Sequence, residues 1–500
     1  MSVKSRFFSP SAGPATLAGV IVLAAGMFAL ASAQPFAASW NDGSRLASIE
    51  SLVERGTFCI DHSVFLHPPP DRCVYDPHNE LLQKGTFDKL FIQGHWYSDK
   101  PPLVSLPLAA AYRLLMLGGV PAPSERPDVF AWIITIWLSG TGYASAVSMM
   151  WILGGRIGLS GKWRWMWLLA FAGATILPAY TRSANSHIAQ LGAVAVVAVL
   201  LCRVADATNA GRRAWGALIT VGFITSFIYN LDFGLGPPFA LIVLAIVTLR
   251  TRNLWAVVSC AAAMLPGVVA GHALHAAIGG SWLKPLNMHR EYLQWPGSPF
   301  VETMTGVVRP GYLAQLTYCL DLLVGRRGFL THNLPLLLAV TAGWTVLKPT
   351  TSAAAARFSR AANGGAGSYR LELVALCVWC VVGWLMYGVL STNHGGGCVS
   401  IRWFVPFLVP GFWLLAKLLV ERPEFTADFL VLSAWGLILG ASAWMVGMWW
   451  PRNVPLYWWC FGGALASWGV VRYCSYRLRK RLALAPSSAA KGQELPARAA

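Results

Sequence analysis

Charge is scarce in this sequence, and negative charge is the scarcer kind. Only 12% of the 500 residues are charged, with 21 Asp and Glu against 39 Lys and Arg, whereas 56% are hydrophobic. A water-soluble domain of this length does not combine so much apolar surface with so few charges. Water is therefore excluded as the main solvent. We predict an all-α polytopic membrane protein with about twelve transmembrane helices.

The basic residues do not form a patch of the kind that binds nucleic acid. A formal net charge of +18 would fit such a partner if the basic side chains shared one soluble face. They stand instead in short loops between apolar runs, where Lys and Arg hold a loop on the cytoplasmic side. We therefore expect no nucleic-acid partner. The loops placed inside carry Arg156, Lys162 and Arg164; Arg212 and Arg213; Arg250 and Arg252; Lys348, Arg357, Arg360 and Arg370; and Arg477, Arg479, Lys480 and Arg481.

The first apolar run, residues 15–33, follows Lys4 and Arg6, which keep the N-terminus inside. The run ends in Ala31-Ser32-Ala33, so a cleaved signal peptide is the alternative to the retained first helix that we favour. With about twelve spans, both termini lie in the cytoplasm. Further spans are predicted at 129–153, 166–180, 188–203, 214–230, 236–249, 254–277, 331–347, 371–391, 403–420, 427–449 and 456–473.

Two long segments, 34–128 and 278–330, are predicted on the outer side, because acids and bases are mixed in them. The apolar stretch 101–120 is predicted to lie along the outer membrane interface. If it crossed the membrane, the basic loop 156–164 would be placed on the outer side. Residues 351–367 and the tail after Leu484 are expected to be flexible. The predicted parts are a first transmembrane helix (1–33), the outer loop 34–128, a transmembrane bundle (129–277), the outer loop 278–330, C-terminal transmembrane helices (331–476) and a cytoplasmic tail (477–500).

Cysteine and histidine show no recognised metal-ligand spacing. The ten cysteines are scattered, and those inside apolar spans behave as small buried hydrophobes. Cys59 and Cys73 lie in the first outer loop, where a disulfide can persist. The histidines of that loop match no ligand pattern, so we expect neither a metal nor a cofactor. They are His62, His67, His78 and His95.

The first outer loop opens with Asn41-Asp42-Gly43-Ser44-Arg45 and continues with apolar residues at helical spacing. This pattern predicts an amphipathic helix that Ser44 or Asp42 caps, that Gly56 ends, and that lies on the membrane surface. Asp42 is then held at the outer rim of the membrane. The alternative is that Asp42 is a helix cap and Arg45 its solvated neighbour.

The same loop ends in a polar and aromatic run, from Gly94 to Asp99-Lys100-Pro101-Pro102. The two prolines fix Lys100 where the apolar stretch begins. A lysine at headgroup level also attracts lipid phosphate without any catalytic purpose, by about 1 kcal/mol.

These elements together resemble the membrane glycosyltransferases of the GT-C fold. The likeness is closest to the branch with protein O-mannosyltransferases and the aminoarabinose transferases of lipid A. The matching residues are Asp42 followed by Arg45, Gly56, and the acid-Lys-Pro sequence at Asp99-Lys100-Pro101. The resemblance is strongest over 34–128 and weaker through residue 330. The sequence departs from the family at Gly43, where a second acid is common, and at His187, where relatives often carry an acid.

The resemblance implies transfer of a sugar, with inversion, from a polyprenyl-phosphate carrier to an acceptor hydroxyl on the outer face of the inner (plasma) membrane. The acceptor is a glycan, a lipid or a protein. Asp42 would be the general base and Lys100 would bind the carrier phosphate, under a roof formed by the loop 278–330. Further substrate-binding candidates, each of which has an ordinary alternative as an interface anchor or solvated group, are Arg45, His95, Tyr97, Asp99, His187, Arg290, Tyr292 and Arg402.

A transporter or flippase of a lipid-linked glycan is the alternative function. Such a protein needs charges at mid-membrane, whereas the predicted spans are nearly free of them and polar residues gather on one face. Asp232 is either a functional intramembrane charge, which costs at least ~2.5–3.5 kcal/mol to bury, or a residue of an outer turn, where the predicted topology places it. A third possibility is a non-catalytic assembly subunit, but such a function would not explain the presence of Asp42 and Lys100.

Overall fold

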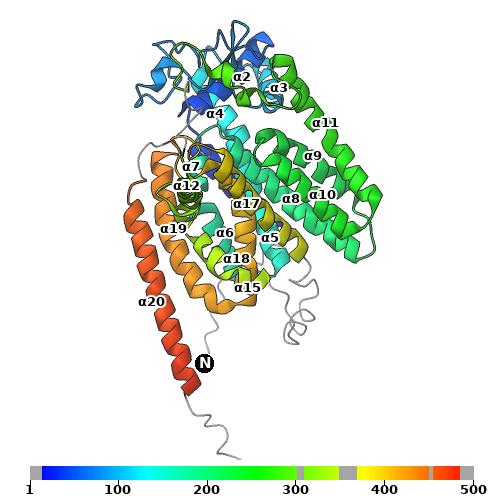
Figure 1. Ribbon diagram of the computed structural model, residues 1–500, viewed down its shortest axis with the longest axis vertical. Coiled ribbons are helices and arrows are strands. Elements are labelled where there is room, and N and C mark those ends of the chain that lie inside the picture. The colour runs from blue at the N-terminus through cyan, green and yellow to red at the C-terminus, as the bar shows by residue number, and fades with distance from the viewer. Residues whose placement is uncertain (1–13, 301–308, 348–368, 450–453, 485–500) are drawn as a thin grey trace, which may run out of the picture.

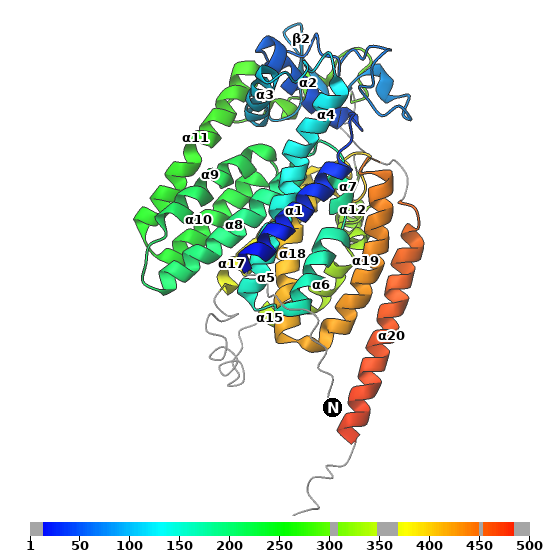
Figure 2. The same ribbon diagram turned by 180° about the vertical axis from the view of Figure 1, so that it is seen from behind.

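The computed structural model describes residues 14–300, 309–347, 369–449 and 454–484, and these residues form a helical bundle with a smaller cap at one end. Figures 1 and 2 show the cap helices α2 and α3 beyond the end of the bundle, with α4 leading down into it. The predicted linker 351–367 and the tail after Leu484 lie outside the described residues.

Helices stand at each of the twelve segments in which a span is predicted. Two of these segments are broken, 166–180 into α6 and α7 and 331–347 into α13, α14 and α15. The bundle contains α1 (Pro14–Ser32), α4 (Pro127–Thr135) continuing through η2 (Ile136–Gly140) into α5 (Thr141–Ile157), α6 (Gly161–Gly173), α7 (Leu177–Tyr180), α8 (Ser186–Asn209), α9 (Trp215–Leu231), α10 (Gly236–Thr251), α11 (Leu254–Ile278), α12 (Tyr312–Val324), α13 (Phe329–His332), α14 (Pro335–Ala342), α15 (Trp344–Leu347), α17 (Arg370–Leu390), η5 (Arg402–Phe407) leading into α18 (Leu408–Glu421), η6 (Pro423–Phe425), α19 (Thr426–Val446) and α20 (Tyr457–Leu484).

Six helical stretches of the described chain are long and apolar enough to cross a membrane. This confirms the prediction of a helical protein of the membrane class, while the number of twelve crossings remains a prediction. Four further apolar helices, α1, α3, α9 and α10, are shorter. The six long stretches are Pro127–Ile157, Ser186–Asn209, Leu254–Ile278, Arg370–Leu390, Arg402–Glu421 and Pro423–Val446.

Asn333 connects the two broken helices. Its side-chain oxygen accepts a hydrogen bond from Ile176 N (3.1 Å), at the break between α6 and α7, and its amide donates to Phe329 O (2.7 Å). A buried backbone group without a partner is costly, so one side chain satisfies backbone groups that both breaks expose.

The helices α5 and α8 cross closely through two glycines. A Cβ at Gly142 would lie 2.5 Å from Ile188 O, and one at Gly192 would lie 2.5 Å from Gly142 O. Small residues allow such close backbone approach between helices in a membrane protein. The crossing fixes the first turns of α8, which carry His187.

The cap contains α2 (Trp40–Arg55), η1 (Leu82–Lys84), a two-stranded hairpin and α3 (Pro102–Leu117). The strands β1 (Lys89–Ile92) and β2 (His95–Ser98) pair antiparallel, with Lys89 opposite Ser98 and Ile92 opposite His95. Gln93 and Gly94 connect them with positive φ angles of 51° and 90°, as in the tight turns that match strand twist. The segment after α11 folds with the cap, since η4 (Arg290–Leu293), which follows η3 (Leu286–Met288), packs against β1. Our sequence analysis predicted no strands.

The helix α2 lies inside the protein, so its predicted position on a membrane surface is wrong. Every residue from Asn41 to Val53 is buried, because α3 and the following loop cover the polar side of the helix as well as the apolar one. Gly56 ends α2 in the left-handed conformation (φ 69°), as predicted, but Ser39 rather than Ser44 or Asp42 is the N-cap residue. The helix α3 does expose apolar side chains, Leu106, Leu114 and Leu117, and its place on the interface remains a prediction.

Candidate active site

Asp42 lies in the first turn of α2 and is 1% exposed. Its backbone N–H donates to Ser39 Oγ (3.1 Å), and its Oδ2 accepts from Ala38 N (3.2 Å), an arrangement close to a capping box. The helix-cap interpretation is thus partly right. Oδ1, however, accepts a hydrogen bond from the indole Nε1 of Trp449 (3.1 Å), which capping does not require.

Burial raises the pKa of Asp42 from 3.8 to about 7, against the hydrogen bond from Trp449 and the positive charge of Arg45, which lower it. A carboxylate with a pKa near neutrality is suited to accept a proton, because a large fraction of it is ionised near pH 7 and that fraction is more basic than an ordinary carboxylate.

The glycine directly after Asp42 is required sterically. A Cβ at this position would lie 2.1 Å from the hydroxyl of Tyr75, which is buried and donates to Phe65 O at 2.5 Å. Any side chain here would collide with Tyr75, so the chain has no room for a second acid beside Asp42.

Lys100 is held by two carboxylates. Its Nζ lies 2.7 Å from Asp99 Oδ2 and 3.2 Å from Asp88 Oδ2, and the residue is 9% exposed. Ser44 donates to the other oxygen of Asp99 at 2.9 Å. Asp99 therefore connects the lysine to α2, the helix that carries Asp42.

Arg402 reaches the same place from the start of η5. With its amide oriented so that the oxygen faces the cations, Asn41 accepts from Lys100 Nζ at 2.6 Å and from Arg402 Nη1 at 2.9 Å. The guanidinium lies 5.2 Å from the ring of Trp449, the residue that covers Asp42. Arg402 Nε is buried and has no hydrogen-bond partner among the described residues. Two cations thus converge beside Asn41.

The side chain of Arg45 is directed at the residues that open α8. Its Nε donates to Ala184 O and its Nη2 to Ser186 Oγ, both at 3.2 Å, and it is 3% exposed. Burial lowers its pKa to about 10, although Asp42 and Asp99 raise it. The side chain ties α2 to the loop that opens α8.

His187, in the first turn of α8, faces an acid from another part of the chain. Its Nδ1 lies 3.7 Å from Asp232 Oδ2, in the turn between α9 and α10 where that residue was predicted. Asp232 also accepts from Tyr387 (2.9 Å) and Gly234 N (2.7 Å), and burial raises its pKa. His187 lies within electrostatic reach of Arg402, Arg45 and Lys100. His187 and Asp232 therefore form a buried pair at the start of α8.

Three predicted residues have no described contact with Asp42, Lys100 or Arg402. His95 is the first residue of β2 and lies three strand residues, or about 10 Å, before Ser98, which is next to the candidate site. Its side chain is hydrogen-bonded to Asp61. Tyr292 donates its hydroxyl to Gly279 O, and Arg290 is exposed on the same short turn, η4.

Part of the predicted roof borders Lys100. Ile278 and Leu286 line a small cavity with Tyr97 and Lys100, whereas the residue over Asp42 is Trp449. Of the predicted outer loop 278–330, residues 301–308 lie outside the described residues.

An apolar cavity of about 270 Å³ opens between α3, α5, α8 and α9. The first lining residue on α3, Val104, lies four residues after Lys100, and the first on α8, Ala189, lies two residues after His187. Among the lining residues are Val104, Leu108, Trp137, Gly142, Ala189 and Phe227. The charged cluster and an apolar cavity are therefore neighbours along both helices.

Comparisons with known proteins return two solved structures, both of ArnT from Cupriavidus metallidurans. The apo structure is 13% identical with a TM-score of 0.46, and the structure bound to undecaprenyl phosphate is 11% identical with a TM-score of 0.44. In each case 93% of this chain and 76% of the other are covered. No protein-family model and no curated protein matches the chain. At these TM-scores the likeness establishes neither family nor substrate.

Several residues of the cluster were missed by the sequence analysis. Asn41 stands directly beside Asp42, so its position was a usable signal. Asp88, Tyr387 and Trp449 gave no signal, because only the tertiary fold brings them to the site.

Proposed function

We propose that this protein is a membrane glycosyltransferase of the GT-C fold. It transfers a sugar from a polyprenyl-phosphate carrier to an acceptor hydroxyl on the outer, periplasmic face of the inner membrane, and both termini lie in the cytoplasm. The observation that carries the proposal is the convergence of Lys100 and Arg402 on Asn41, beside the buried carboxylate of Asp42.

In the proposed reaction, Asp42 accepts the proton of the acceptor hydroxyl as its oxygen attacks the anomeric carbon. The bond between that carbon and the phosphate oxygen breaks, and attack from the opposite side inverts the configuration. General base catalysis of this kind contributes typically ~10²–10⁴-fold in rate.

The leaving polyprenyl phosphate gains negative charge, which Lys100 and Arg402 stabilise in a site with little water. The unpartnered Nε of Arg402 supplies a donor for a phosphate oxygen. The neighbouring apolar cavity would receive the first isoprene units of the carrier. Undecaprenyl phosphate, the ligand in one of the ArnT structures, belongs to this chemical class.

The test compares sugar release from radiolabelled polyprenyl-phosphate sugars by membranes that contain the wild type, Asp42→Asn or Glu50→Gln. Glu50 is a matched control, because it is also a buried acid of α2 whose pKa burial raises to about 7, but it bonds to Ser63 and Arg55. We expect release by the wild type and Glu50→Gln and none by Asp42→Asn.

Two results would overturn the proposal. Equal release by Asp42→Asn would remove Asp42 from the reaction. No release by the folded wild type with a broad panel of carriers and acceptors would exclude the transferase and favour a transporter of lipid-linked glycans.

A further inference from the structure

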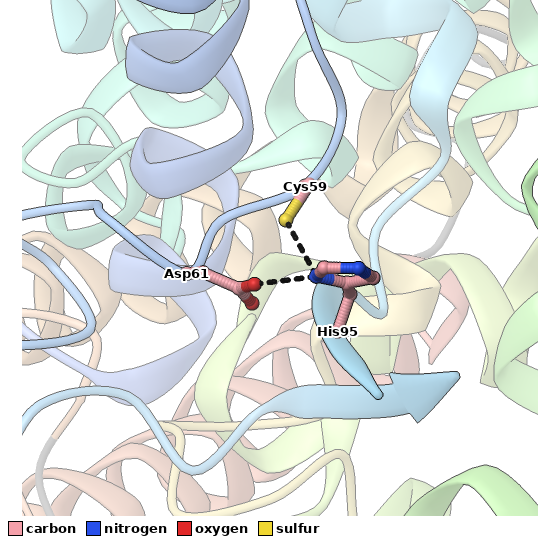
Figure 3. A group of neighbouring side chains, drawn as sticks. All are labelled: Cys59, Asp61 and His95. Atoms are coloured by element: carbon pink, nitrogen blue, oxygen red, sulfur yellow. Dashed lines mark hydrogen bonds and ion pairs between the residues drawn. The ribbon is translucent and has the colours of Figure 1, made fainter. Parts of the chain in front are cut away.

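Three side chains of different donor types meet at the edge of the cap. Cys59 Sγ lies 3.8 Å from His95 Nδ1, and the same nitrogen lies 2.7 Å from Asp61 Oδ2. All three ligand atoms lie within 4.8 Å of one another. Figure 3 shows the thiol and the carboxylate pointing at the same ring nitrogen.

Backbone pairing, rather than chance contact of surface side chains, holds the three groups together. Cys59 pairs with Tyr97 of β2 in an antiparallel bridge, and Ile60 N donates to Trp96 O at 2.8 Å. Asp61 accepts from Trp96 N at 2.6 Å, so its carboxylate is already oriented. On the other side, the tight turn at Gln93 and Gly94 fixes where the strand with His95 begins.

The donor set fits zinc. A thiolate, an imidazole and a carboxylate are the ligands that Zn²⁺ takes, and three protein ligands with a water molecule complete a tetrahedron. With Zn–S near 2.3 Å and Zn–N near 2.0 Å, two tetrahedral ligands stand roughly 3.5 Å apart, close to the observed separation of sulfur and nitrogen. The side chain of His95 is 58% exposed, which leaves an approach for the ion and for the water.

We propose that Cys59, Asp61 and His95 form a Zn²⁺ site on the cap. The ion replaces the proton shared between His95 and Asp61 and the proton of the Cys59 thiol, so its binding releases protons to the solvent. The Oδ2 end of the Asp61 carboxylate moves away from His95 Nδ1 as this happens, because two ligands of one ion stand farther apart than the partners of a hydrogen bond, while Oδ1 keeps its bond to Trp96 N.

The position of the site indicates what the ion would do. Cys59 lies three residues after Gly56, which ends α2. The strand β2, which begins with His95, is followed directly by Asp99 and Lys100. An ion between them would brace the two elements that carry the candidate active site. This inference is independent of the proposed reaction, because it concerns metal binding and stability alone.

The experiment uses the full chain in detergent, stripped with a chelator and then titrated with Zn²⁺ or Co²⁺. Metal content, thermal unfolding and the thiolate-to-cobalt charge-transfer absorption are measured for the wild type, Cys59→Ser and His95→Ala. The matched controls are Cys73→Ser and His78→Ala, since both residues lie in the same loop but outside the cluster.

We expect one bound ion, a raised Tm on adding Zn²⁺ and the cobalt–thiolate band in the wild type and both controls. Loss of a direct ligand should weaken Zn²⁺ binding by more than the about 10–100-fold that removing a ligand's hydrogen-bond partner costs. Cys59→Ser should lose the cobalt–thiolate band entirely.

Three outcomes would overturn the site. The first is that the wild type binds no zinc, and the second is that Cys59→Ser and His95→Ala bind as much zinc as the wild type. The third is a Cys59–Cys73 disulfide in mass spectra of the native protein. Both thiols are free in the structure. None of these outcomes depends on sugar transfer, so a failed transferase assay leaves this inference standing, and the reverse also holds.

Discussion

Trp449 donates its indole N–H to the carboxylate of Asp42 at 3.1 Å, although 407 residues separate the two. The bond joins the segment after α19 to the first turn of α2. The same indole ring lies 5.2 Å from the guanidinium of Arg402. One side chain therefore contacts both the proposed base and one of the proposed phosphate-binding cations.

The pKa of Asp42 sets the first prediction. A general base works only when it is deprotonated, and burial raises this pKa to about 7. The rate of sugar transfer should therefore fall roughly tenfold per pH unit below pH 7 and level off above it. The measurement is a pH profile of kcat/KM in detergent-solubilised protein. A profile that stays flat down to pH 5 would exclude Asp42 as the base.

Replacing Trp449 by Phe should move that profile. The substitution removes a hydrogen bond that stabilises the carboxylate, so the pKa of Asp42 and the midpoint of the profile should shift to higher pH. Trp444→Phe is the control, because Trp444 donates instead to Ser32 Oγ at 3.1 Å. An unmoved midpoint in Trp449→Phe, or an equal shift in Trp444→Phe, would contradict the role of the bond.

The convergence of Lys100 and Arg402 predicts that these two basic residues contribute to binding of the polyprenyl phosphate and that Arg290 does not. Lys100→Gln and Arg402→Gln should each weaken binding of a polyprenyl phosphate by about 10–150-fold, the value of a charge-assisted hydrogen bond of about 1.5–3 kcal/mol. Arg290→Gln should leave binding unchanged, because Arg290 is exposed and has no described contact with the cluster. Titration with a fluorescent polyprenyl phosphate measures all three. A large loss in Arg290→Gln would restore that residue to the site.

Local signals in the sequence were sufficient to locate the helices and to single out two residues of the candidate site. Apolar runs located a helix at each predicted span, because hydrophobic length is a property of a single segment. Gly56 was recognised as the end of α2 for the same reason, since a left-handed cap depends on neighbouring residues alone. Asp42 and Lys100 were singled out from short motifs.

Properties that depend on contacts between residues far apart in the chain could not be predicted from the sequence. The amphipathic pattern of α2 predicted one buried face, but the polar side is buried too, through contacts such as Arg45 with Ala184 and Ser44 with Asp99. Arg290 and Tyr292 were chosen by residue type in a loop without periodicity, where nothing in the sequence fixes direction. Asp61 and Cys59 were overlooked as partners of His95, because backbone pairing rather than spacing brings them together.

The close approach of Tyr75 to Gly43 gives the last prediction. Gly43→Ala places a Cβ 2.1 Å from the buried Tyr75 hydroxyl, and overpacking of this kind costs about 1–3 kcal/mol. The variant should unfold at a lower temperature and lose transfer, because the displaced α2 carries Asp42. Gly19→Ala in α1 is the control, since a Cβ there meets nothing within 4 Å and alanine favours the helix. Thermal unfolding of both variants in detergent measures the difference. If Gly43→Ala were as stable and active as the wild type, the space for a second acid beside Asp42 would exist after all, and the steric explanation for its absence would fail.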